Sequence, residues 1–407
     1  MKVSLNKMLG MVVVLVIAGY PLVSFVPPIL GVTSTPISIL FRFIYVALSL
    51  VVIGVVLMKR HPVRLNIGHI MFFIFWFIYS IRLFTDLSIL SIPLYEDHDA
   101  FYFYSLAFGG ALIPSLAIIF KGKSLDVFKS LELIYKFYFA FAIILIILLA
   151  AGSSISYFHN GRLFANENLN SISTGHAGGS LALLALAFLF NNSTYRFSRI
   201  WLYVAIFLGM GIAFYSGSRS PLVVVALVVM VFIMRVLMKR RINAKLLNSV
   251  LVLVTALVLV GTFYIVPKLD SGEFKVVERL NKSGGEQEVR KTVWLNAAYQ
   301  FINNPIVGDQ FLERSNGKYP HNILLEVPMA TGLLGTIPFI IMLIALGKRV
   351  LYLFLHEPLA MPLLALFFQF FLWNLTSGSL FGSGGLWLLI ILLLTVTQAQ
   401  FDFEQKD

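Results

Sequence analysis

Long apolar runs follow one another along almost the whole chain. A helix that crosses a bilayer needs about 20 predominantly apolar residues. We count twelve runs of suitable length, at residues 8–28, 37–58, 67–85, 102–120, 134–152, 172–190, 199–216, 220–238, 247–267, 322–346, 358–376 and 383–399. The polar breaks are short except at about residues 268–320. The pattern predicts an all-α polytopic membrane protein: one domain over residues 1–407, with a long loop between spans 9 and 10.

Composition supports this reading and removes other classes of protein. The chain is 59% hydrophobic and 12% charged, which is far from a soluble domain. It contains no cysteine, so disulfides and thiolate chemistry are excluded. The net charge of +12 would suit a nucleic-acid ligand, but the basic residues lie mostly in short loops, where they orient helices. We therefore expect no nucleic-acid partner. The first apolar run has no small-x-small cleavage site, so we expect it to remain as the first span.

The loop charges predict the orientation of the helices. Basic residues gather in alternate loops, namely Lys59, Arg60 and Arg64; Lys121, Lys123 and Lys129; Arg196 and Arg199; Arg235, Lys239, Arg240, Arg241 and Lys245; and Lys348 and Arg349. Because such loops stay in the cytoplasm, both termini are predicted to be cytoplasmic and the long loop to lie outside. Arg162, Arg219 and Arg290 are then basic residues on the outer side, against the general bias.

The long loop is predicted to contain an amphipathic helix. Apolar residues recur at helical spacing from Val289 to Ile302, and Asn303-Asn304-Pro305 ends the run. Such a helix should lie at the membrane interface or fold over the bundle. Arg290 precedes Trp294 by four residues and so borders the apolar face.

Two arginines are candidates for binding an anion. Arg219 lies in the turn Gly217-Ser218-Arg219-Ser220-Pro221, where Pro221 suits the first turn of a helix. A helix N-terminus and a guanidinium together form an anion site. Arg290 would be the second cation, since arginine binds phosphate oxygens through two parallel hydrogen bonds. Ser218 is a candidate contact to the substrate. The alternative is that both arginines merely anchor the protein at lipid headgroups.

His321 is the candidate general base. Pro320 fixes the backbone before it, and a histidine titrates near neutral pH. Asn322 and Glu326 flank it and are candidates for holding a substrate or orienting a partner. Polar side chains at a membrane boundary are rarely placed there without a function. A lone histidine is nevertheless often structural.

Other polar residues give weaker signals. Arg162 precedes an asparagine-rich run, residues 166–171, that would cap a helix or bind sugar hydroxyls. Asp97 and Asp99 form an outer Asp-x-Asp that would suit a divalent cation, although short acidic runs are usually just solvated. Arg42 and Arg82 lie within predicted spans, where each must pair with a carboxylate or backbone or line a cavity.

These residues, in this order, resemble the O-antigen ligase and O-antigen polymerase superfamily of bacterial envelope glycosyltransferases. The resemblance covers residues 161–335 and rests on four motifs: Gly161-Arg162-Leu163; Ser216 to Pro221; Arg290 with Trp294 and then Asn304 to Gly308; and His321-Asn322 with Glu326 and then Gly332 to Gly335. It implies a multi-pass protein of the bacterial inner membrane, with an active site on the periplasmic side.

The resemblance also implies a reaction. The donor would be a glycan on undecaprenyl pyrophosphate, and the acceptor a hydroxyl of a second glycolipid. Arginines such as Arg219 and Arg290 would hold the pyrophosphate, and a histidine such as His321 would activate the acceptor, without metal or other cofactor. The transfer would be inverting. A chain-length regulator is an optional partner.

Four readings remain open on the sequence. A polymerase would extend the lipid-linked glycan, and a ligase would pass it to the lipid A core; the segment around Arg162 favours a polymerase slightly. A flippase or other transporter of lipid-linked oligosaccharide also fits twelve spans, but it has less need of the long outer loop. A non-catalytic assembly partner would have no need of Arg219, Arg290 and His321.

Overall fold

The computed structural model describes residues 4–60, 62–94, 99–159, 161–190, 197–238, 285–315, 317–397 and 400–401. In these ranges the chain is almost entirely helical, apart from one antiparallel hairpin. Its strands are β1 (Tyr157–His159) and β2 (Arg162–Phe164), with Phe158 opposite Leu163. The prediction of an all-α membrane protein is therefore confirmed.

The helices before the hairpin form the first half of the bundle. They are α1 (Leu5–Val14), which continues through a π-helical turn, Leu15–Gly19, into α2 (Tyr20–Val23); α3 (Val26–Leu30); α4 (Ser34–Met58); α5 (Ile67–Phe84), which continues through a π-helical turn, Thr85–Ile89; α6 (Ala100–Tyr104), which continues through Ser105–Leu112 into α7 (Ile113–Lys121); and α8 (Val127–Ala150).

The helices after the hairpin form the second half. They are α9 (Ser171–Phe190), α10 (Arg199–Tyr215), α11 (Arg219–Met238), α15 (Gly285–Asn303), α16 (Ile323–His356), α17 (Met361–Asn374) and α18 (Gly384–Thr395).

The predicted spans correspond closely to these helices. Eleven of the twelve have a helical counterpart, and the run at 247–267 lies outside the described residues. By length and composition, seven of the described helices can cross a membrane, and three shorter apolar helices accompany them. The largest difference is α16, which continues ten residues past the predicted end at 346 and carries Lys348 and Arg349 in its last turns. The total of twelve spans, and the division into one domain with an inserted loop, stay predictions.

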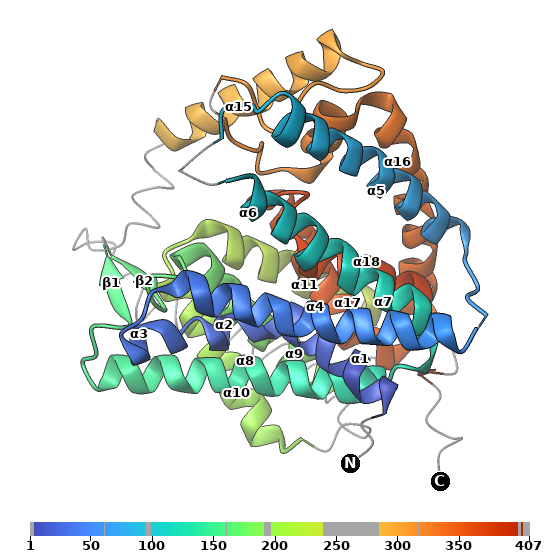
Figure 1. Cartoon of the computed structure of the whole chain (residues 1–407). Coiled ribbons are helices and arrows are strands. Elements are labelled where there is room, and N and C mark those ends of the chain that lie inside the picture. The colour runs from blue at the N-terminus through green and yellow to red at the C-terminus, as the bar shows by residue number, and fades with distance from the viewer. Residues whose placement is uncertain are drawn as a thin grey trace.

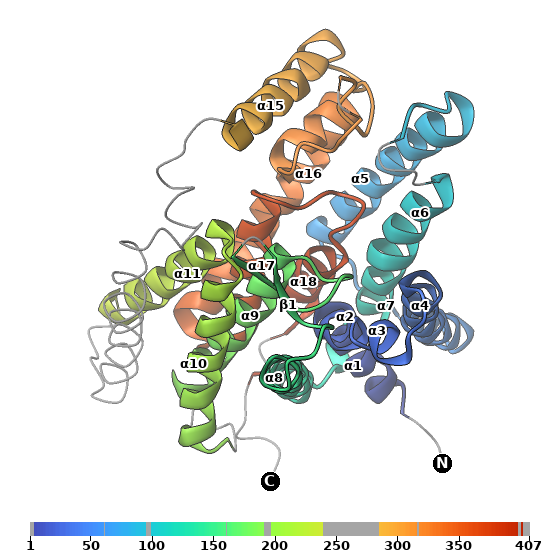
Figure 2. The ribbon, with the colours of Figure 1, turned by 90° about the vertical axis from the view of Figure 1, so that its left-hand side faces the viewer.

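Helix α9 lies at the centre of the second half. Nearly all of its side chains are buried, because α8, α10, α11 and α17 pack around it. Its apolar residues therefore surround the whole helix rather than form one stripe. Helix α16 packs along α5, and α15 packs against α16 near its N-terminal end (Figures 1 and 2). Helix α15 and the β1–β2 hairpin therefore lie at the same end of the bundle but apart from each other.

At the opposite end of the bundle, residues 122–125 contact both the beginning of α1 and Gln400. Ser124 donates a hydrogen bond to the Asn6 side chain, and Gln400 donates to the carbonyls of Gly122 and Leu125. Arg349 donates to the Val396 carbonyl near the same end. Arg64, Lys123 and Arg349 line one pocket at this end, as expected if it faces the cytoplasm. The compartment itself stays a prediction.

Helix α15 confirms the predicted helix in the long loop, including its end at Asn303. Its packing differs from the predicted apolar face. Val293 and Ala297 are buried, whereas Trp294 and Ile302 are 38% and 63% exposed. One narrow strip of the helix packs against the protein, and apolar residues remain on the outer side. A helix with this distribution suits the boundary between the bundle and the outer lipid headgroups.

A break in α16 explains two of the sequence motifs. Gly332 has φ 57° and ψ −158°, so the helix is interrupted there. The freed N–H groups of Leu333 and Leu334 donate to the carbonyls of Pro305 and Ile306. The freed carbonyl of Met329 accepts from the Asp309 N–H. The loop after α15 thus supplies the hydrogen bonds that the helix loses, as buried backbone requires.

Arg82 on α5 holds this junction in place. Its guanidinium donates to the carbonyls of residues 307, 308, 309 and 330, and it pairs with Asp86 at 3.3 Å. Asp86 also accepts from the Phe311 N–H at 2.8 Å. Of the open roles for Arg82, the structure therefore shows pairing with both a carboxylate and the backbone.

The break gives a stability prediction. The conformation of Gly332 is accessible essentially to glycine alone, at a cost of about 1–3 kcal/mol for other residues. A Cβ there would also meet the backbone of Gly308 and Ile306. We expect Gly332→Ala to yield little folded protein, as judged by size-exclusion chromatography and thermal unfolding in detergent. Gly347→Ala is the control, because a Cβ at Gly347 meets nothing within 4 Å. Equal melting temperatures for the two variants would contradict the prediction.

Candidate functional site

His321 lies in a tight turn directly before α16. Its φ is +58°, a left-handed conformation that few residues other than glycine adopt, histidine among the more frequent. The ring of Tyr319 lies 4.3 Å from the imidazole, and the Pro320 carbonyl accepts a hydrogen bond from the Trp294 indole at 2.8 Å. Asn322 caps α16 by accepting from the Leu324 N–H. The turn is thus fixed from both sides, and α15 is tied to it.

The environment of His321 favours its neutral form. Burial lowers the pKa of His321 to about 4, and the positive charge of Arg290 contributes; a hydrogen bond with the Ser377 backbone opposes the shift, and Lys318 adds to it. The Nδ1 atom is buried without a hydrogen-bond partner. A neutral imidazole with a free nitrogen can accept a proton, which is what a general base must do.

Glu326 is fully buried and holds the loop between α17 and α18. Both carboxylate oxygens accept from the Leu380 N–H, at 3.1 and 3.0 Å. The same loop contains Ser377, which contacts His321. Of the two roles expected for Glu326, this placement supports orienting a partner. The carboxylate does not reach the cavity described below.

Arg219 is the first residue of α11, where a helix N-terminus favours anions. Gly217, with φ +63°, makes the turn before it. Arg162 of β2 packs on this turn, because a Cβ at Gly217 would lie 2.8 Å from its Cγ, and it donates to the Ser218 hydroxyl at 2.8 Å. The structure therefore brings Arg162 and Ser218 together beside Arg219. Among the described residues, no hydrogen bond or ion pair engages the Arg219 guanidinium.

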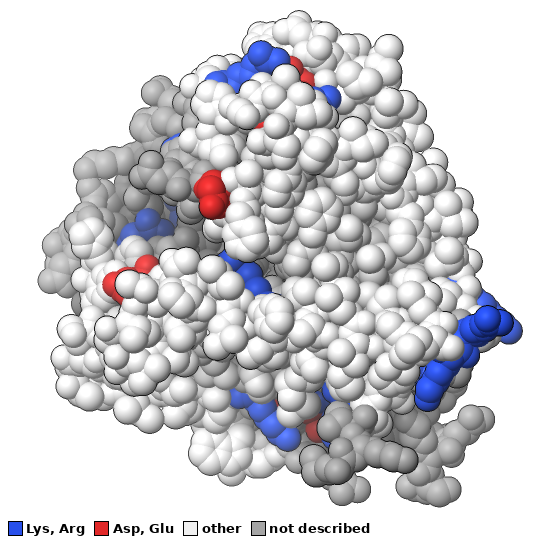
Figure 3. Space-filling model, viewed as in Figure 1, with Lys and Arg blue, Asp and Glu red and all other residues white. Residues whose placement is uncertain are grey.

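Residues 376 and 377 connect the turn that holds Arg219 and Ser220 with His321. Ser220, next to Arg219, shares a hydrogen bond of 2.8 Å with Thr376. Ser377 follows and contacts His321 through its backbone. Arg290 is exposed on α15, and its charge acts on His321. Arg219, Arg290 and His321 thus come from three elements to one end of the bundle, where basic side chains lie at a hollow (Figure 3).

The chain was compared with known proteins. Residues 203–340 match the family model of the O-antigen ligases. We refer to this stretch as the O-antigen ligase domain, after the family that it is similar to. The match confirms the resemblance to the superfamily of O-antigen ligases and polymerases. Members of this family are glycosyltransferase-like enzymes that act in O-antigen ligation or polymerisation. No curated protein matches the chain.

The O-antigen ligase domain includes Arg219, Arg290 and His321 but ends before α17 and begins after β2. Arg162 and the loop that contacts His321 thus lie outside the matched residues. The sequence motifs of the domain fall on the turn before α11, on α15, and on the junction at Gly332. The domain alone therefore does not contain all of the groups that surround His321.

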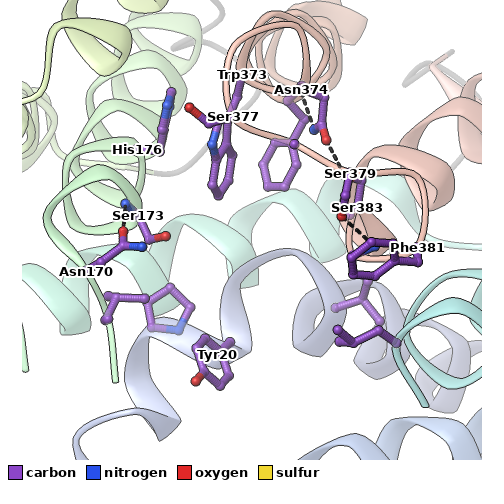
Figure 4. Close-up of a pocket in the computed structure, with 18 of the residues that line it drawn as sticks. Tyr20, Asn170, Ser173, His176, Trp373, Asn374, Ser377, Ser379, Phe381 and Ser383 are labelled. Atoms are coloured by element: carbon purple, nitrogen blue, oxygen red, sulfur yellow. Dashed lines mark hydrogen bonds between the residues drawn. The ribbon is translucent and has the colours of Figure 1, made fainter. Parts of the chain in front are cut away.

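A cavity of about 620 Å³ adjoins the domain. It lies between α9, the N-terminal helices and the loop after α17, and includes Tyr319 and Ser377, both neighbours of His321 (Figure 4). The sequence reasoning missed most of its lining. His176 lies within a predicted apolar span, and residues 377–379 fall between the predicted apolar runs at 358–376 and 383–399. Polar residues inside apolar runs were the available signal. Arg42 lines this cavity, which was one of its open roles.

The alternative metal site gains no support. Asp99 caps α6 by accepting from the Tyr102 N–H at 2.9 Å, and Asp97 lies outside the described residues. Within the described ranges, no group of three or more His, Cys, Asp or Glu side chains could hold a metal ion. Capping accounts for the position of Asp99 without a cation.

Proposed function

We propose that this protein transfers a glycan from undecaprenyl pyrophosphate to the hydroxyl of an acceptor glycolipid, on the periplasmic face of the bacterial inner membrane. The observation that carries the proposal is the meeting of Arg219, Arg290 and His321 at one end of the bundle. Two guanidinium groups can neutralise a pyrophosphate, and a neutral imidazole can take a proton. A lipid carrier can stay in the bilayer beside such a site.

The proposed reaction is a single displacement at the anomeric carbon of the donor sugar. The acceptor oxygen forms a bond to that carbon while the bond to the pyrophosphate oxygen breaks, which inverts the anomeric configuration. The hydroxyl proton passes to His321. The leaving pyrophosphate keeps the bonding electrons, and Arg219 and Arg290 stabilise its developing charge. The proposed steps need no metal or other cofactor.

The remaining residues would position these groups. Arg162 and Ser218 form one unit with the turn before Arg219, so we assign them contacts to the pyrophosphate or to the sugar next to it. Asn322 keeps the first turn of α16 in place, and Glu326 holds the loop that contacts His321. A substitution at Glu326 would therefore act on His321 through Ser377 rather than through the substrate.

Two acceptors fit this chemistry. We favour a second lipid-linked repeat unit, which makes the protein a polymerase, because the segment around Arg162 is built into the Arg219 turn. A chain-length regulator would then be a partner. The matched family is described as that of the O-antigen ligases, so a ligase that uses the lipid A core as acceptor is the second candidate.

Reconstitution in liposomes tests the proposal. The substrate is an undecaprenyl pyrophosphate-linked repeat unit, with chelator present, and with or without lipid A core. A ladder of longer lipid-linked glycans without the core means a polymerase, and product only on the core means a ligase. No covalent product from folded protein would overturn the proposed transfer and favour a transporter. Product that requires a divalent cation would overturn the metal-independent mechanism.

A further inference from the structure

The cavity beside the O-antigen ligase domain has a lining of unusual chemistry for a membrane bundle. Hydroxyl, amide and imidazole groups alternate with aromatic rings around it. The lining residues include Asn168, Ser173, His176, Tyr319, Trp373 and Ser377. They come from the loop before α9, from α9 itself, from α17 and from the loops beside His321 (Figure 4). Polar groups that converge on an enclosed space from several elements indicate a binding site.

Three polar atoms in the cavity wall have no hydrogen-bond partner. They are Nδ2 of Asn168, Nδ1 of His176 and the hydroxyl oxygen of Ser377, and all three are buried. Buried polar groups in proteins are nearly always paired, and leaving them unpaired is unfavourable. All three side chains belong to residues that line the cavity, so a ligand there would lie beside the unpaired groups. The ligand should therefore carry several groups that donate and accept hydrogen bonds.

Aromatic rings stand beside these polar atoms. The Trp373 indole stacks on the His176 ring, with centroids 4.4 Å apart and an interplanar angle of 16°. Tyr319 stands between the cavity and His321. A pyranose ring has a face of C–H groups and a rim of hydroxyls, so it suits a wall in which aromatic faces alternate with hydrogen-bonding groups.

The cavity touches both halves of the proposed catalytic site. His176 bonds to Ser220, the neighbour of Arg219, at 3.2 Å, and Ser377 contacts His321. The charged residues among the described lining are Arg42 and Lys318, and no carboxylate belongs to it. A sugar in this cavity would thus lie next to the reacting groups. Its charge should be zero or negative, because a cationic amino sugar would meet only basic residues.

We propose that this cavity binds one neutral or acidic sugar ring of the lipid-linked glycan, with Trp373 and His176 as its aromatic wall and Asn168, His176 and Ser377 as its hydrogen-bonding groups. The proposal rests on the glycosyl transfer proposed above and names the part of the substrate that the site recognises. The sugar belongs either to the donor or to the acceptor, and the two sources need different tests.

The test compares binding of two lipids to the full-length protein in nanodiscs. One is undecaprenyl pyrophosphate, and the other is the same lipid carrying a hexose, an N-acetylhexosamine or a hexuronic acid. We expect at least one glycosylated lipid to bind about tenfold more tightly than the bare lipid, since a site with unpaired polar groups discriminates against a ligand that lacks their partners. Equal affinity for every lipid would show that the cavity does not bind the sugar of the donor.

Two variants assign that preference to the cavity. His176→Phe keeps the stack on Trp373 but removes both ring nitrogens, and Ser173→Phe fills the space. Both should reduce the preference for the glycosylated lipid to within about twofold, and Ser173→Phe should leave binding of the bare lipid unchanged. Ile172→Phe is the matched control, because Ile172 neighbours Ser173 on α9 but does not line the cavity. A preference that survives both variants would overturn the donor assignment.

The acceptor arm uses the methyl glycosides of the same sugars, which have no pyrophosphate. Saturation-transfer NMR should show their binding, and Ser173→Phe should abolish it, if the ring belongs to the acceptor. Absence of both the donor preference and glycoside binding would sink the proposal. Loss of bare-lipid binding in Arg219→Gln and Arg290→Gln tests the pyrophosphate site separately. The two proposals can therefore fail independently of each other.

Discussion

Arg219→Gln is expected to lower turnover about 10²- to 10³-fold, and Arg290→Gln by a similar factor, because each removes a charge that stabilises the leaving group in the proposed reaction. The assay is the rate of glycan transfer in liposomes under saturating donor. Arg219 lies at the N-terminus of α11, where the helix dipole adds to its charge. Arg290 stands on α15, which the Trp294 indole ties to the Pro320 carbonyl.

Controls separate this role from a general effect of charge. Lys291→Gln removes a neighbouring exposed cation on the same helix and should leave turnover within about twofold. Arg290→Lys and Arg219→Lys keep the charge but lose the two-pronged geometry, so they should fall between the wild type and the glutamine variants. Full activity of both glutamine variants, in protein that inserts and folds normally, would refute the assignment. Equal losses in Lys291→Gln and Arg290→Gln would point to surface attraction of the lipid instead.

His321→Gln is expected to lower turnover about 10²- to 10⁴-fold, the range for loss of a general base. Glutamine keeps a polar side chain next to Tyr319 but cannot take up the acceptor proton. Asn322→Ser provides a control, because serine also caps a helix N-terminus, adds no charge beside His321 and should leave turnover nearly unchanged. If His321→Gln kept most of its activity, a different group would have to accept the proton.

The pH dependence gives an independent test of His321. A base works only when unprotonated, and the pKa of His321 is lowered to about 4. The ratio kcat/KM, which reports ionisations of the free enzyme, should therefore fall only as pH drops through about 4, and not near the ordinary 6.5.

A substitution at Lys318 should shift the acid limb, which is the fall of kcat/KM at low pH, in a known direction. Lys318 contributes to the lowered pKa, so Lys318→Gln should shift the limb to higher pH, and Lys318→Arg should leave it in place. A limb near 6.5 in the wild type would contradict the burial argument. A limb near 4 that persists in His321→Gln would belong to another residue.

The parts of the site that the sequence predicted share one property: each is unusual for its local surroundings. Arg219 is a cation on the side that the predicted topology disfavours, and His321 follows a proline at a polar–apolar boundary. The helical repeat from Val289 to Ile302 and its stop at Asn303 were equally local, and α15 bears out that helix. Local anomalies of this kind can be read from one sequence because their physical reason lies within a few residues.

The contacts that join these parts could not be read in that way. Pro305 and Ile306 complete the hydrogen bonds of a helix that begins at residue 323, and Arg82 on α5 holds the same junction. His176 and Thr376 both reach Ser220 from other helices. Each pairing spans tens to hundreds of residues, and the apolar runs between them look alike in composition.

The sequence by itself determined the helical membrane class, the spacing of the spans and the type of chemistry that Arg219, Arg290 and His321 can perform. Hydrophobic run length and side-chain pKa are properties of the residues themselves. Only the tertiary structure decided that residues 376–377 bridge Arg219 and His321, that Glu326 is buried on the Leu380 amide, and that a polar cavity opens beside them. Helix packing decides these features, because it selects which buried polar groups meet and which remain unpaired for a ligand.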